Sequence, residues 1–211
     1  TRTAVEDTRT ITRTTGMRNI TRGEGLWYDP LAQTILCDEE GGMFVTSVDI
    51  FFSHKDASLP VWVEIRSVVN GYPAKNILPF SVKSLTPADV NTNVEDGSTA
   101  TTFTFDSPVY LRNGLEYALV VASDSPEYKI WISRIGEVDI GGVRSVSSQP
   151  TLGSLFKSQN ASTWTASQYE DMKFVLRRAS FDIANQGSLV LVNETFTEED
   201  IPGGAGNNLI P

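Results

Sequence analysis

The residues that could catalyse a reaction are few in this sequence. His54 is its one histidine and Cys37 its one cysteine, so any Ser-His-Asp or Cys-His arrangement would have to use them. Zinc sites that need two histidines or two cysteines are excluded, and so is a disulfide within the chain. His54 stands beside Lys55 and Asp56 at the end of an apolar stretch, which predicts a surface turn. Cys37 lies in an apolar run, which predicts a buried structural thiol.

Acidic residues form three clusters, at positions 38–40, 95–96 and 198–200. A glycosidase needs two carboxyl groups that face each other across a cleft, and the sequence does not place any of these clusters so. None of them shows the alternating Asp-x-Asp-x-Asp-Gly pattern of a calcium-binding loop. We therefore predict that the protein is not an enzyme and needs no cofactor or metal, with glycosidase activity and calcium binding left open as alternatives.

Aromatic side chains are the best candidates for ligand binding. Tryptophan and tyrosine rings can stack on sugar rings, and Trp62 and Trp131 fall on the outward faces of their predicted strands. A glycan-stacking platform or an interface between chains is predicted at Trp62, Trp131, Trp164 and Tyr72. The alternative is that these aromatic rings fill the core or an interface and bind no sugar.

The first 25 residues differ from the rest, because Thr and Arg alternate and large apolar residues are almost absent. β-Branched Thr favours extended chain that can add a strand to a neighbour. We predict an arm over residues 1–25 that docks on an acidic partner through Arg9, Arg13 and Arg18, with a disordered linker as the alternative. We predict a second extended arm or linker over residues 182–211. We also expect the chain to be a piece of a longer protein.

The stretch from Gly42 to Lys55 predicts the central strand of the fold, because apolar residues recur in it at every second position. Similar short stretches recur at 61–66, 101–105, 108–112, 116–121, 128–133 and 173–178, separated by Gly, Pro, Asn and Asp turns. With no βαβ rhythm, the sequence predicts an all-β fold, an antiparallel β-sandwich of jelly-roll type over residues 26–181. The residues predicted to lie in or near the core are Phe44, Val48, Ile50, Val63, Ile65, Phe103, Phe105, Leu119, Ile130, Phe174 and Leu176.

Composition and charge narrow the classes of partner. The 26 acidic residues outnumber the 17 basic ones and give a net charge of -9, which argues against a non-specific nucleic-acid binder. Hydrophobic residues make up 40% of the chain, enough for a sizeable core. No apolar run approaches the ~20 residues that cross a bilayer, so we predict no insertion into a membrane.

Four stretches occur in a distinctive order. They are Tyr28-Asp-Pro-Leu-Ala-Gln-Thr, Gly41-Gly-Met-Phe-Val-Thr-Ser-Val-Asp-Ile-Phe-Phe, Val63-Glu-Ile-Arg with Asn70-Gly-Tyr-Pro, and Gly153-Ser-Leu-Phe-Lys-Ser-Gln-Asn-Ala-Ser-Thr-Trp-Thr with Asp171-Met-Lys-Phe. As a set they resemble a domain of the structural proteins of tailed bacteriophages, found in baseplate and tail-fibre-associated polypeptides. The resemblance covers Trp27 to Phe181.

This resemblance implies a β-sandwich module with an architectural role and without catalytic residues. It implies a virion protein of the tail or baseplate region, made in the cytoplasm of the bacterial host. The expected partners are other virion structural proteins and copies of the same chain. A module that binds carbohydrate on the host surface is the alternative function.

Overall fold

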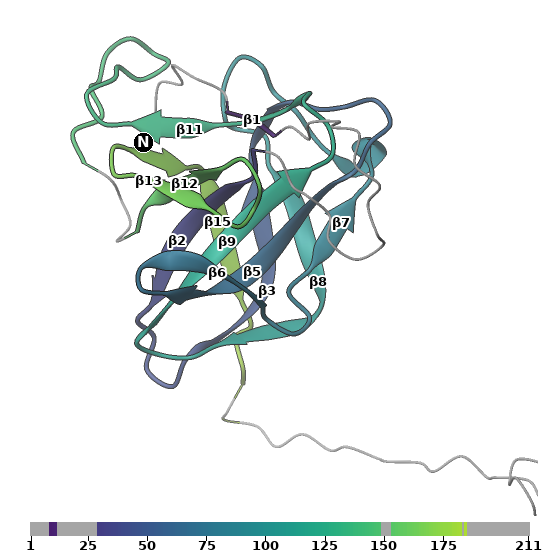
Figure 1. Ribbon diagram of the computed structural model, residues 1–211, viewed down its shortest axis with the longest axis vertical. Helices are drawn as coiled ribbons and strands as arrows, with labels where there is room; N and C mark the ends of the chain where they lie inside the picture. Colours follow the sequence, from purple (N-terminus) through teal and green to yellow (C-terminus); the bar gives the residue numbers. More distant parts are fainter. Residues whose placement is uncertain (1–8, 12–28, 149–152, 183, 185–211) are drawn as a thin grey trace, which may run out of the picture. The chain divides into compact units, whose positions relative to one another are not determined.

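The computed structural model describes residues 9–11, 29–148, 153–182 and 184, and Figure 1 shows its course. The chain divides into a unit of residues 1–179 and a unit of residues 180–211. Within the described residues the regular structure is β-strand, apart from a short 3-10 turn, η1 (Pro87–Asp89). The predicted all-β antiparallel sandwich class is confirmed. The jelly-roll connectivity and the domain boundaries at 25/26 and 181/182 stay predictions.

One layer of the sandwich is a seven-stranded antiparallel sheet. Its strands follow the order β13-β12-β2-β9-β5-β6, and β7 pairs with β5 as well. Their bounds are β2 (Leu31–Cys37), β5 (Val61–Val69), β6 (Tyr72–Ile77), β7 (Lys83–Leu85), β9 (Leu115–Ser123), β12 (Leu155–Ser158) and β13 (Trp164–Ser167). In Figure 1 the β12–β13 hairpin and β6 lie in front of β2, β9 and β5, so the two ends of this sheet curl over its outer face.

The opposing layer consists of three short sheets, in the orders β15-β3-β8, β1-β10-β4 and β11-β14. Their strands are β1 (Arg9–Ile11), β3 (Met43–Ile50), β4 (Phe52–His54), β8 (Thr101–Leu111), β10 (Tyr128–Ile130), β11 (Ile132–Arg134), β14 (Glu170–Met172) and β15 (Phe174–Arg178). Trp131 joins the three sheets, because its backbone N–H donates to the carbonyl of Phe51 at 2.9 Å and its carbonyl accepts from Lys173 at 3.0 Å.

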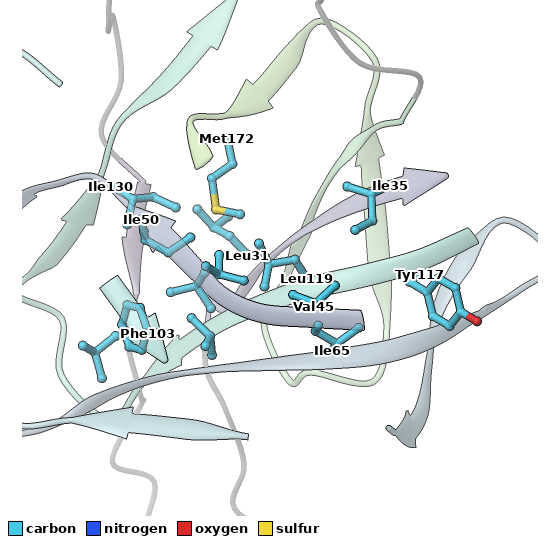
Figure 2. Close-up of a cluster of buried hydrophobic side chains, with 14 of the residues drawn as sticks. Leu31, Ile35, Val45, Ile50, Ile65, Phe103, Tyr117, Leu119, Ile130 and Met172 are labelled. Atoms are coloured by element: carbon cyan, nitrogen blue, oxygen red, sulfur yellow. The ribbon is translucent and has the colours of Figure 1, made fainter. Parts of the chain in front are cut away.

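Side chains from both layers meet in one apolar core (Figure 2). Leu31, Ile65 and Leu119 come from the large sheet, Ile50 and Phe103 come from the opposing layer, and all five are fully buried. Burying one such side chain stabilises a fold by about 1.5–3 kcal/mol, so this core is the main source of stability.

Most of the predicted core is confirmed, and one residue of it is wrong. Phe174 and Leu176 are only partly buried, although they pack against the core. Phe44 is 39% exposed and lies on the outside against Tyr110, with ring centroids 5.0 Å apart. A bulge in the pairing of β3 with β8, between Val45 and Ser47, reverses the alternation of β3. Val45 therefore takes the inward position that the period-two pattern predicts for Phe44.

Candidate functional site

The outer face of the large sheet gathers three of the four predicted aromatic residues. On β5 the side chains of Val61, Val63 and Ile65 are buried in the core, so strand alternation turns Trp62 and Arg66 to the other face. The ring of Trp164 lies 6.0 Å from the guanidinium carbon of Arg66. The ring of Tyr72 lies 5.6 Å from that of Phe156, edge on.

A second, smaller apolar cluster fills the middle of this face. Small residues on β2 and β9 form one side of it, and Phe156 and Trp164 of the β12–β13 hairpin pack against them; the residues on β2 and β9 are Ala32, Ala118 and Val120. Trp164 is therefore only 7% exposed and offers no face to a sugar ring. Tyr72, 51% exposed, and the half-buried Trp62 keep accessible surface.

Arg66 connects the turn of the β12–β13 hairpin to β5. Its Nε donates to the carboxylate of Glu64 at 2.5 Å, and both side chains are only 6% exposed. Its Nη1 donates to the carbonyl of Ala161, in the turn of the hairpin, at 3.0 Å. A buried guanidinium needs such partners, since an unpaired buried charge is costly. Arg66 therefore has a positioning role, which the sequence pattern did not indicate.

The prediction that Trp131 points outward to a ligand is wrong. Its side chain is 7% exposed, and its indole N–H donates to the carbonyl of Asn93 at 3.0 Å. The loop of residues 91–99 covers the ring, and Lys173 fastens that loop by donating to the carbonyl of Gly97 at 2.6 Å. Trp131 lies between β10 and β11, and a loop that strand alternation does not take into account buries it.

The predicted N-terminal arm is described over three residues. They form β1, whose register with β10 pairs Arg9 with Ile130, Thr10 with Lys129 and Ile11 with Tyr128. This part of the arm adds an antiparallel strand to a sheet edge, and it does so within its own chain. Arg13 and Arg18 lie outside the described residues. Docking of the arm on an acidic partner stays a prediction.

Two neighbouring carboxyl groups on β14 have opposite pKa shifts. Burial raises the pKa of Glu170, but hydrogen bonds from Lys157, Arg134 and Ser167 outweigh burial and bring that pKa down to about 2. Arg134 donates to Glu170 through Nη2 at 2.6 Å.

Burial raises the pKa of Asp171 to about 6, because a single hydrogen bond, from Gln33 at 2.8 Å, opposes it. Its second oxygen, Oδ2, is buried and lacks a hydrogen-bond partner within the part of the chain that the structure describes. Neither carboxyl group stands out in the sequence. Because Glu170 is held by two cations and Asp171 by an amide, the neighbouring carboxyls do not share a proton as a catalytic pair does.

The remaining candidates for chemistry have structural roles. Asp56 accepts the backbone N–H groups of Ser58 and Leu59 at 2.6 and 2.8 Å, and its other oxygen accepts from Ser125. Those hydrogen bonds, led by that of Ser125, lower the pKa of Asp56 to about 2. His54 is exposed at this turn and Cys37 is fully buried, as predicted.

Over residues 29–148 and the other described ranges, no three His, Cys, Asp or Glu side chains gather closely enough to hold a metal ion. The described part of the chain also has no helix long and apolar enough to cross a membrane. Comparison with known protein families, curated proteins and solved structures finds no match to this chain.

Proposed function

We propose that the chain is a structural module of a bacteriophage virion, in its tail or baseplate region, that assembles through contacts with copies of itself and with other virion proteins. The observation that carries the proposal is that the N-terminal segment β1 pairs with β10 as an added edge strand. An added strand gains affinity from main-chain hydrogen bonds. The resemblance of the sequence to a phage tail module supports the virion setting.

The arm is long enough to make the same contact with a second copy. Residues 12–28 link β1 to the described start of the sandwich at Asp29. Seventeen extended residues span up to about 60 Å, more than the width of a small domain. Exchange of an identical element between copies preserves every native contact and is a low-cost route to oligomers. In the proposed assembly, β1 of one copy therefore pairs with β10 of the next.

The virion setting predicts that the chain is a stoichiometric part of purified particles. Quantitative mass spectrometry of density-gradient-purified phage from the cells that produce this chain is expected to detect its peptides at a fixed ratio to the major tail protein. Particles that lack tails serve as the control and are expected to lack these peptides. Abundant peptides in the cell lysate that disappear from purified, tailed particles would contradict the proposal.

A further inference from the structure

A hollow of about 530 Å³ opens beside the turn of the β12–β13 hairpin. Its volume lies in the range of small-molecule sites, about 300–1,000 Å³. The lining consists of polar side chains, those of Lys157, Ser158, Gln159, Asn160, Thr163 and Thr165. A hydrophobic ligand would gain little from such a lining, whereas a ligand rich in hydroxyl groups would find both donors and acceptors along it.

The hairpin turn that shapes this hollow is already ordered. The side-chain oxygen of Asn160 accepts the backbone N–H groups of Ser162 at 3.0 Å and Thr163 at 2.7 Å. The carbonyl of Ala161 accepts a hydrogen bond from the buried Arg66. A ligand therefore meets a preformed site and does not have to order a loop, which would cost affinity.

The charge of the hollow is balanced. The ammonium group of Lys157 forms an ion pair with Glu170, whose side chain is 4% exposed. The other five lining residues carry hydroxyl or amide groups, and Gln159 and Thr165 are exposed. An amide or a hydroxyl donates and accepts at the same time, as the hydroxyl groups of a sugar do. These features favour an uncharged ligand over an anion.

We infer that this hollow binds a neutral saccharide, through hydrogen bonds to Gln159, Thr163 and Thr165. The inference is independent of the proposed assembly role, since β1 and β10 contribute none of the lining. It also moves the predicted glycan contact away from Trp131 and Trp164, whose rings are buried.

Nuclear magnetic resonance titration of the ¹⁵N-labelled 211-residue chain tests the inference. The probes are glucose, galactose, mannose and N-acetylglucosamine, with N-acetylneuraminic acid as the charged comparison. At least one neutral sugar is expected to shift the backbone amides of residues 157–165 in a saturable way. The double variant Gln159→Ala/Thr165→Val is expected to weaken that binding about 10- to 100-fold, since each lost hydrogen bond is worth about three- to tenfold.

Thr104→Val, an exposed hydroxyl on β8, is the matched control and is expected to leave the titration unchanged. The substituted side chains in both variants are exposed, so the variants are expected to remain folded. Their amide spectra check this. Shifts from N-acetylneuraminic acid alone, the absence of shifts with all five sugars, or binding that survives the double variant would each overturn the inference.

Discussion

Replacing Phe52 by alanine is expected to lower the free energy of unfolding by about 3–5 kcal/mol. The side chain is fully buried where the two layers meet, and its ring centroid lies 6.4 Å from that of Phe103 and 5.8 Å from that of Tyr128. Truncation removes apolar surface from the core and leaves a cavity that the surrounding side chains fill only in part. Equilibrium unfolding in guanidinium chloride measures the change.

Phe80→Ala is the matched control, because the same ring is removed at a position that is 68% exposed. It is expected to change the free energy of unfolding by less than about 0.5 kcal/mol. An equal decrease in the free energy of unfolding of Phe52→Ala and Phe80→Ala would contradict a core between the two layers.

Replacing Asp171 by asparagine is expected to stabilise the protein at pH 7 by up to about 3 kcal/mol, the free energy that corresponds to the shift of its pKa from 3.8 to about 6. Burial raises the pKa of this carboxyl from 3.8 to about 6, so at neutral pH the folded protein holds a buried charge that it disfavours. Asparagine has no charge and keeps the side-chain oxygen that accepts the hydrogen bond from Gln33.

The sign of the pH dependence follows from this raised pKa. Below about pH 4, Asp171 is protonated in both the folded and the unfolded chain and does not destabilise the fold. As the pH rises from there through about 6, ionisation favours the unfolded chain and the stability falls. The stability of the wild type minus that of Asp171→Asn is therefore expected to fall between pH 4 and pH 7. Thr104→Val, which alters an exposed side chain that carries no charge, is the control and is expected to give a flat difference. A flat difference for Asp171→Asn too would contradict the account of this site.

Strand alternation is the part of the fold that the sequence reveals best. Val61, Val63 and Ile65 follow it without interruption, so the inner and outer faces of β5 could be predicted from the sequence. Phe44 could not, because the bulge that turns it outward depends on the pairing of β3 with β8, which is more than 50 residues away. A one-residue shift reverses every side chain that follows it.

The polar groups of the interior could not be predicted for a related reason. Glu170 and Asp171 are neighbours in the sequence, and their environments differ because of residues far along the chain. Arg134 lies 36 positions before Glu170, and Gln33 lies 138 positions before Asp171. Burial of Trp131 by the loop of residues 91–99 is likewise a tertiary contact. Local patterns carry no information on such contacts.

Disulfide trapping between copies tests the exchange of β1 most directly. Thr10 and Lys129 face each other in the register of β1 with β10. Directly opposed residues in antiparallel strands have Cα atoms about 4.5–5.5 Å apart, within the range that a disulfide spans. Two chains with different tags, one carrying Thr10→Cys and the other Lys129→Cys, are co-expressed and then oxidised. Cys37 is fully buried and does not compete.

Exchange of the arm predicts a disulfide-linked dimer that carries both tags on a non-reducing gel. Each single variant expressed alone is expected to give no such dimer, because residue 10 does not face residue 10 of another copy. The double variant Thr10→Cys/Lys129→Cys shows that the register is correct, because it forms the bond in either arrangement. A double variant that forms its disulfide only within one chain, together with no dimer from the co-expressed single variants, would contradict assembly by exchange of the arm.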